Sequence, residues 1–323
     1  MAPRSDPNAG RALPTRHVAS VEQRPAHARW LVDSLWSAAG VGILGGLPKC
    51  LKTWLATELG LAVASGAPAL GRFAVPAPGP VLVYAAEDDL PSMRSRFQAV
   101  ADARAVTLRD APVFLVDVPA LRLDDPAQLR ALRRTVEKLR PRLLVLDPFV
   151  RIARVDENSA QEVSAVLGSL RALQREHDLA VLLVHHMRKS PSPHPGQQLR
   201  GSSDFAAWSD SALYLVRRGP DGFLLCGEHR GAPAPPSLRV RLVTDPSPHL
   251  VLDDAPAAQL PAAHGSALQH ALLERLRAAA RPMPTLELRD LLKVRKATLL
   301  DALRDLAARG LVRHDALGWT AAP

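Results

Sequence analysis

A loop that ends in a Lys-Thr pair is the segment of this chain best suited to chemistry. The segment GGLPKCLKT, residues 45–53, follows an apolar run at 41–44 and leads directly into a helix-like stretch. Against the pattern G-x-x-x-x-G-K-[ST], Gly46, Lys52 and Thr53 fit, whereas Leu51 stands where the second glycine is expected. In such a loop, backbone N–H groups at a helix N-terminus surround phosphates, the lysine reaches the β- and γ-phosphates and the hydroxyl binds Mg²⁺. The residues expected to form this nucleotide site share the loop and the first helical turn: Gly46, Pro48, Lys49, Cys50, Leu51, Lys52, Thr53 and Trp54.

Two acidic residues follow buried strands and could complete that site. Asp147 comes after LLVL, 94 residues beyond Thr53, and Glu87 comes after VLVYAA. A strand-end aspartate typically completes the Mg²⁺ site of a phosphate loop, so Thr53 and Asp147 are the predicted metal ligands. A glutamate on a neighbouring strand can orient or deprotonate an attacking water. The alternative is an ordinary strand–turn–helix whose Lys-Thr pair is accidental, with acids that only cap helices.

The elements that must position these residues follow from the apolar pattern. Runs of strand length at 41–44, 81–86, 113–116, 143–146 and 180–184 alternate with helix-like segments at 53–65, 90–104, 126–140 and 159–177. Continuous apolar strands that alternate with helices predict an α/β domain with a mostly parallel sheet. Further runs at 212–216, 222–226, 238–243 and 249–252 leave no room for helices, and predict an antiparallel extension of the sheet.

The C-terminal part has a different pattern. Helix-like segments at 266–280, 285–292 and 295–310 precede two short strands within 311–321. Three helices and a hairpin are the order of a winged-helix domain. We therefore expect four parts: an N-terminal arm (1–28), the α/β domain (29–252), a Pro/Ala linker (253–265) and a small winged-helix domain (266–323).

Composition narrows the class of protein. The chain has 323 residues and a net charge of +9, and 35 of its 41 basic residues are arginine. Arginine suits phosphate groups, so a nucleotide or nucleic-acid partner is indicated, although a GC-rich genome gives the same bias. Two cysteines make no disulfide framework, and no apolar run is long enough to cross a membrane. We do not expect the Pro- and Arg-rich start of the sequence to be a signal peptide. We expect a soluble protein of the cytoplasm.

The motifs, taken together, resemble one family. They follow in this order: WLVDSLW, GVGILGGLPKCLKTWLATELGLAVASG, VLVYAAEDDLPSMRSRF, LLVLDPFVRI, DENSAQEVSAVLGSLRALQ, AVLLVHHMRKS and LRGSSDFAAWSDSALYLVRR. This order resembles the RecA-fold ATPases, and most of all the plasmid RepA-type hexameric replicative helicases and their AAA family ATPase relatives. The resemblance covers residues 30–218 and implies a RecA-like P-loop core, ATP and Mg²⁺ as cofactors, and a homo-hexamer.

The resemblance also implies roles for single residues. Lys52 and Thr53 match the phosphate and Mg²⁺ ligands, Glu87 the catalytic glutamate and Asp147 the Walker B aspartate. The pair His185-His186 matches the position at which this fold senses the γ-phosphate. Leucine at position 51 departs from the family pattern and puts nucleotide affinity and turnover in question.

Nucleic-acid contacts are expected in two places. The segment 189–200 matches the loop that faces single-stranded DNA in RecA-like rings, where Arg188, Lys189 and Arg200 meet phosphates; the alternative is a solvated surface loop. In the winged helix, Arg295 and Lys296 meet duplex DNA, unless this module docks protein instead.

Two further arginines, Arg217 and Arg218, are candidates for an arginine finger that reaches the neighbouring subunit's nucleotide. The sequence thus favours an ATPase motor that translocates along single-stranded DNA or unwinds DNA. The alternative is an ATP-switched DNA-binding regulator or loader with weak or no hydrolysis.

Overall fold

The fold is taken from a computed structural model of the whole chain. The structure describes residues 13–23, 25–188, 195–199, 201, 203–218, 222–253, 267–279, 281–292, 294, 296–308, 310–315 and 317–322.

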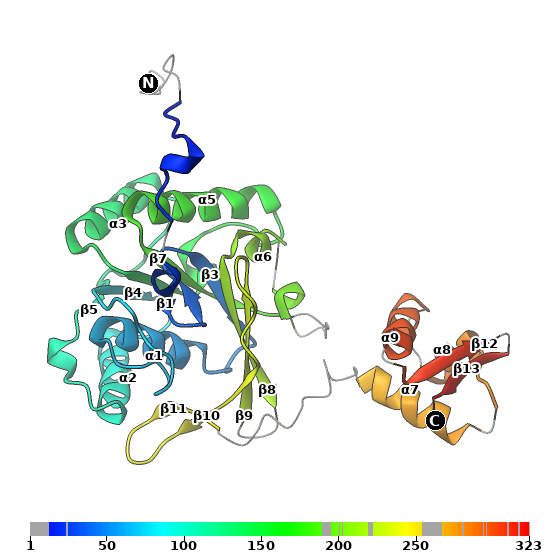
Figure 1. The fold of residues 1–323 in the computed structure, drawn as a ribbon. Helices are drawn as coiled ribbons and strands as arrows, with labels where there is room; N and C mark the ends of the chain where they lie inside the picture. Colours follow the sequence, from blue (N-terminus) through cyan, green and yellow to red (C-terminus); the bar gives the residue numbers. More distant parts are fainter. Residues whose placement is uncertain are drawn as a thin grey trace.

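A nine-stranded sheet forms the centre of the molecule (Figure 1). Across the sheet the strands are β11 (His249–Leu252), β10 (Leu238–Val243), β9 (Gly222–His229), β8 (Ser211–Arg218), β3 (Val41–Gly46), β7 (Ala180–His186), β6 (Leu143–Asp147), β4 (Val81–Ala85) and β5 (Val113–Leu115). All pairs from β8 to β5 are parallel, and the pairs β8–β9, β9–β10 and β10–β11 are antiparallel. The predicted fold class is confirmed: a mainly parallel α/β sheet with an antiparallel extension.

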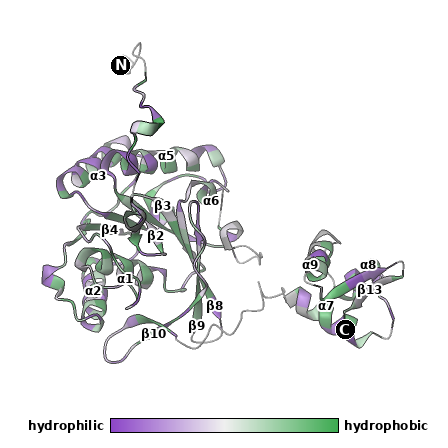
Figure 2. Cartoon of the chain, viewed as in Figure 1, coloured by the Kyte–Doolittle hydropathy of each residue, from purple (hydrophilic) through white to green (hydrophobic). Residues whose placement is uncertain are grey.

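Helices cover both faces of this sheet. On one face lie α1 (Lys52–Ser65) and α2 (Leu90–Ala103), which share a core with Leu44, Val83, Val145 and Val184. On the other face lie α3 (Pro126–Leu139), α4 (Phe149–Ile152), α5 (Ala160–His177) and α6 (Asp204–Trp208), around a second core. Hydrophilic and hydrophobic residues alternate along α3 and α5 in Figure 2, as helices with one buried face require.

Gly42 allows β3 and β8 to lie side by side. A Cβ atom at this position would lie 1.8 Å from the carbonyl oxygen of Ser211 and 2.9 Å from the Trp36 ring. No side chain larger than hydrogen fits there, because real Cβ atoms do not approach backbone atoms so closely. The close pairing of these two strands matters for the site, since β3 leads into the phosphate loop.

Several short elements were not predicted from the sequence. The strands β1 (Trp30–Val32) and β2 (Trp36–Ser37) pair as a small hairpin, and their apolar side chains join the core beneath α1. Single 3-10 turns lie at η1 (Val18–Ser20), η2 (Ala26–Arg29), η3 (Leu108–Asp110) and η4 (Pro195–Gln198).

The C-terminal elements form a core of their own. The helices α7 (Ala267–Ala278), α8 (Thr285–Leu292) and α9 (Lys296–Ala308) precede the paired strands β12 (Val312–Asp315) and β13 (Gly318–Ala321). Leu272, Leu288, Leu303 and Trp319 are among the residues buried between them. The predicted order of three helices and a hairpin is confirmed, whereas the winged-helix assignment and the domain boundaries stay predictions. Residues 254–265 of the predicted linker lie outside the described residues.

Within the part of the chain that the structure describes, no helix combines the length and the apolar character that a membrane span requires.

Candidate nucleotide-binding site

The loop between β3 and α1 has an unusual backbone for its sequence. Lys49 has φ 62° and Leu51 has φ 60°, ψ 20°, so both lie in the left-handed region that favours glycine. Leu51 precedes the first residue of α1, and its half-buried side chain packs against the core. A leucine side chain offers no acceptor to the first N–H groups of the helix, so these donors are left for a ligand. With leucine at position 51 the loop keeps its left-handed conformation and its backbone N–H donors, but a residue with a Cβ is strained at this φ.

Lys52 is directed into this loop. Its side chain is buried, and its Nζ donates to the carbonyl oxygen of Leu47 at 2.9 Å. Burial lowers the pKa of Lys52, while the negative charge of Asp147 opposes that shift. An ammonium group has three N–H donors, and the loop carbonyl uses one of them. The remaining donors suit phosphate oxygens.

The structure brings Thr53 and Asp147 together. The Thr53 hydroxyl donates to Asp147 Oδ2 at 2.7 Å, although 94 residues separate the two in the chain. Burial raises the pKa of Asp147 to about 6, and the hydrogen bond from Thr53 and the charge of Lys52 act in the opposite direction. A hydroxyl and a carboxylate are the hard oxygen ligands that Mg²⁺ prefers. The two residues thus fit the metal site that the sequence predicts.

Glu87 lies two residues after the end of β4 and forms an ion pair with Arg151. Its Oε1 accepts from Arg151 Nε of α4 at 3.0 Å, and both side chains are about half exposed, at 48% and 60%. Glu87 is close enough to influence the pKa values of both Lys52 and Asp147. Asp89, two residues further on, accepts from the Ser92 N–H and caps α2. Asp89 therefore has a structural role as the N-cap of α2, and Glu87 is the acidic residue of this segment that lies near Lys52 and Asp147.

The two adjacent histidines of β7 have different surroundings. His185 is fully buried and stacks on Phe205, with ring centroids 4.1 Å apart, while Phe149 meets its edge. Successive residues of a strand face opposite sides, so His186 lies on the α1 face, where its backbone is paired in register with Gly46. The sensing position expected for both histidines suits His186 alone. His185 is a core residue of the opposite face.

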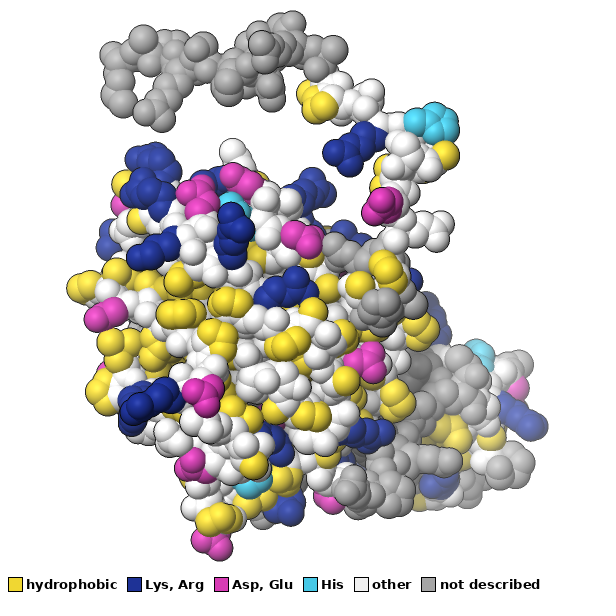
Figure 3. Space-filling view, turned by 60° about the vertical axis from the view of Figure 1, so that its left-hand side comes forward, with side chains coloured by type: hydrophobic (Ala, Val, Ile, Leu, Met, Phe, Trp, Pro, Cys, Tyr) yellow, Lys and Arg dark blue, Asp and Glu magenta, His cyan; other side chains and the backbone are white. Residues whose placement is uncertain are grey.

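The predicted DNA contacts are described only in part. Arg188 is exposed and donates to the carbonyl oxygen of Gly201 at 2.8 Å. Lys189, Arg200 and Arg295 lie outside the described residues, and Lys296 is the first residue of α9. Lys and Arg side chains are most frequent toward the upper end of the face that Figure 3 presents, with some Asp and Glu side chains among them.

Two arginines at the end of β8 differ in orientation. Arg217 Nη2 donates to the Lys49 carbonyl oxygen at 3.1 Å, and its guanidinium lies over the Phe223 ring, 4.7 Å from the centroid. Arg218 is exposed and, as the next residue of the strand, faces the other side of the sheet. Sequence reasoning missed both the contact of Arg217 with the loop and the Arg151–Glu87 pair, since neither has a local sequence signal.

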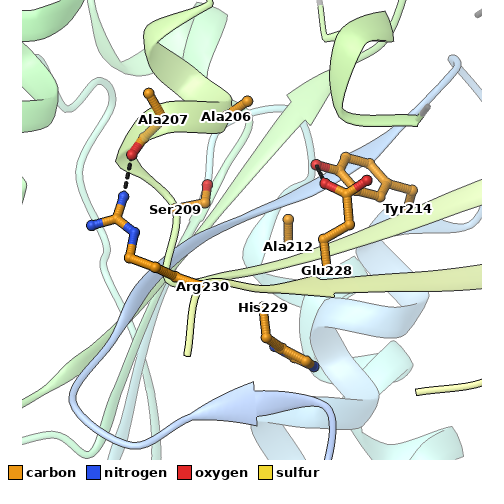
Figure 4. A pocket seen from close by; sticks show the side chains of 8 residues that line it. All are labelled: Ala206, Ala207, Ser209, Ala212, Tyr214, Glu228, His229 and Arg230. Atoms are coloured by element: carbon orange, nitrogen blue, oxygen red, sulfur yellow. Dashed lines mark hydrogen bonds between the residues drawn. The ribbon is translucent and has the colours of Figure 1, made fainter. Parts of the chain in front are cut away.

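A hollow of about 280 Å³ lies elsewhere, beside α6 (Figure 4). Its lining includes Ser209, Tyr214, Glu228 and Arg230, and the Tyr214 hydroxyl donates to Glu228 at 3.2 Å. Tyr214 belongs to the core on the face opposite α1, so the sheet separates this hollow from the phosphate loop.

Comparison with known proteins identifies the family. A family model described as an AAA domain, AAA_25, matches residues 8–192, which is more than half of the chain. The chain belongs to the AAA_25 family. The matched residues include the phosphate loop, Glu87, Asp147 and His186, and the resemblance to RecA-fold P-loop ATPases is thereby confirmed at the level of family and fold. A search of curated proteins gives no match.

Three solved structures are similar to this member of the AAA_25 family. A DnaB-like replicative helicase, studied in its interactions with primase, has a TM-score of 0.50 at 12% identity, over 64% of this chain and 56% of that one. The chain thus spans about half the length of that helicase, and the likeness shows a shared fold. The ATPase domain of G40P (TM-score 0.48, 11% identity, 64% and 82% covered) and the RadB recombinase (0.47, 18%, 64% and 88%) are also similar.

Proposed function

We propose that this chain binds ATP with Mg²⁺ at the loop between β3 and α1 and hydrolyses it to move along, or unwind, DNA. The hydrogen bond between Thr53 and Asp147 carries the proposal. It joins the loop hydroxyl to the strand-end carboxylate beside a buried lysine, and this is the set of groups that a phosphate loop needs. Membership of the AAA_25 family supports the same reading.

Each side chain has a role in the proposal. Lys52 donates to phosphate oxygens, and Thr53 and Asp147 hold Mg²⁺, which when bound neutralises charge on the phosphates. Glu87 orients the attacking water and accepts its proton, and for this its carboxylate must leave Arg151. His186 donates to the γ-phosphate from the end of β7.

The proposed partner is DNA, and the proposed form is a cytoplasmic homo-hexamer. Single-stranded DNA would meet Arg188, Lys189 and Arg200, and duplex DNA would meet a winged-helix domain at 266–323. Arg218, exposed at the end of β8, is the candidate to reach a neighbouring subunit's nucleotide. The fold shared with a DnaB-like replicative helicase supports a motor on DNA.

A second function is favoured by two observations at the site. Lys49 and Leu51 hold a left-handed backbone without glycine, and Glu87 is tied to Arg151. A site of this kind could bind ATP and release it slowly without hydrolysis. In that case the chain is an ATP-switched DNA-binding regulator or loader.

ATP turnover with and without single-stranded DNA, measured beside strand displacement, separates the two functions. The motor predicts turnover that DNA stimulates, together with displacement of an annealed strand. The regulator predicts ATP-dependent DNA binding without displacement. A full-length protein that neither binds nor hydrolyses ATP contradicts both.

A further inference from the structure

The C-terminal end of β8 extends beyond the end of β3, alongside the start of the phosphate loop. The last residue of β3, Gly46, is paired in register with Leu215, and β8 continues for three residues beyond that pair while the β3 chain turns into the loop. Arg217 is therefore placed beside the loop by the register of two parallel strands.

Two of the contacts of Arg217 hold its guanidinium beside the loop. It lies over the ring of Phe223, which is directly opposite across the β8–β9 pair and is buried in the α1-side core. Its Nη2 donates to the carbonyl oxygen of Lys49 at 3.1 Å. The aromatic ring below and the carbonyl ahead both favour this orientation of the exposed, planar guanidinium.

The contacted peptide is the strained part of the loop. Lys49 has φ 62°, a conformation that lysine rarely adopts, and Leu51 repeats it two residues later. Glycine would populate this backbone freely, but neither position has glycine. A hydrogen bond to the Lys49 carbonyl favours the left-handed conformation from outside the loop.

We infer that Arg217 is a positioning residue that acts on the phosphate loop of its own subunit. It holds the Lys49 peptide so that the N–H groups before α1 are already arranged for phosphate, a conformation that glycine in place of Leu51 would adopt without this support. This role differs from an arginine finger, which must reach a neighbouring subunit's nucleotide. The inference rests on the proposed ATP site.

The variants Arg217→Ala and Arg217→Lys test it, with Arg72→Ala as the matched control. Arg72 also lies over a phenyl ring, that of Phe73 at 5.7 Å, but it follows the C-terminal end of α1, whereas the phosphate loop precedes the first residue of that helix. Loss of one charge-assisted hydrogen bond predicts that Arg217→Ala weakens binding of a fluorescent ATP analogue with Mg²⁺ about tenfold or more. The KM for ATP should rise by a similar factor, and kcat should change less. The reason is that the ordered loop binds ATP equally well in the ground state and in the transition state. Arg217→Lys keeps a donor and should recover part of the affinity, and Arg72→Ala should bind as the wild type does.

Mixing the Arg217→Ala protein with the Lys52→Ala protein decides which subunit Arg217 serves. The Lys52→Ala subunits retain Arg217, so a finger reaching across subunits would restore turnover in the mixture. A residue acting within its own subunit gives no recovery, and recovery overturns the inference.

Hydrogen exchange of the amides at 50–53, measured without nucleotide, gives a readout that does not depend on ATPase activity. Faster exchange in Arg217→Ala than in Arg72→Ala is expected, and equal exchange contradicts the inference. If the wild type and Arg217→Ala bind the ATP analogue equally well, only the role of Arg217 is overturned. Wild-type protein that binds none overturns the proposed function and the inference with it.

Discussion

Replacing Leu51 by glycine tests how the loop tolerates a side chain where glycine is expected. Leu51 has φ 60°, and a non-glycine residue pays about 1–2 kcal/mol for that conformation. Glycine removes this strain, but it loses the half-buried contacts of leucine with the core, about 1 kcal/mol, and adds unfolded-state entropy of roughly 0.5–1 kcal/mol. The three effects nearly cancel, so Leu51→Gly should change the free energy of unfolding by no more than about 1 kcal/mol.

Alanine at the same position is the matched comparison. Leu51→Ala loses the contacts yet keeps the strained φ, so it should be less stable than Leu51→Gly by about 1 kcal/mol. Because the backbone N–H is retained in all three proteins, their affinities for ATP with Mg²⁺ should agree within about 1 kcal/mol. Urea unfolding and calorimetric titration measure the two quantities. Equal stability of the glycine and alanine variants would refute the strain argument, and ATP binding that appears only in Leu51→Gly would show that the leucine closes the site.

Three further changes have defined outcomes. Glu87→Gln should retain ATP while turnover falls about 10²-fold or more, the scale of a lost general base, and unchanged steady-state turnover would assign the water to another group. Gly42→Ala should lower the free energy of unfolding by about 3 kcal/mol, the upper range for overpacking, because its Cβ meets the Ser211 carbonyl; Gly168→Ala, with open space around it, should not be destabilising. Burial raises the pKa of Glu58 above its ordinary value of 4.5, so the stability that its protonated form gives is complete below that value and is lost as pH rises through the raised pKa. The unfolding free energy of the wild type minus that of Glu58→Gln should therefore fall as pH rises from 4 to 8, and a value that stays constant in urea titrations over this range would contradict this.

The sequence was sufficient to predict the main elements of the sheet. Continuous apolar runs such as 143–146 and 180–184 are buried on both faces, and the segments between them are long enough for helices. The runs after residue 211 follow too closely for helices, and they form the antiparallel extension. The contact between Thr53 and Asp147 was also predictable, because the ends of parallel strands meet at one edge of a sheet.

The orientation of single side chains was not predictable from those same runs. In AVLLVHH every position is apolar up to the histidines, so the pattern gives no indication of which histidine faces the loop, and the sheet register places His185 in the opposite core. The contact of Arg217 with Lys49 depends on β8 lying beside β3, although 168 residues separate the two side chains in the chain. Strand order of this kind is a tertiary property, and no local signal encodes it.

Calorimetric titration of ATP with Mg²⁺ into the wild-type chain and into Lys52→Ala tests the central claim most directly. The buried Lys52 is placed to donate to phosphate oxygens, and removing its ammonium group takes away charge-assisted hydrogen bonds. We predict binding heat for the wild type that depends on Mg²⁺ and is lost in Lys52→Ala, with the thermal unfolding of both unliganded proteins remaining cooperative. A wild-type chain that gives no binding heat, or a Lys52→Ala protein that binds ATP as tightly as the wild type, would contradict the nucleotide site.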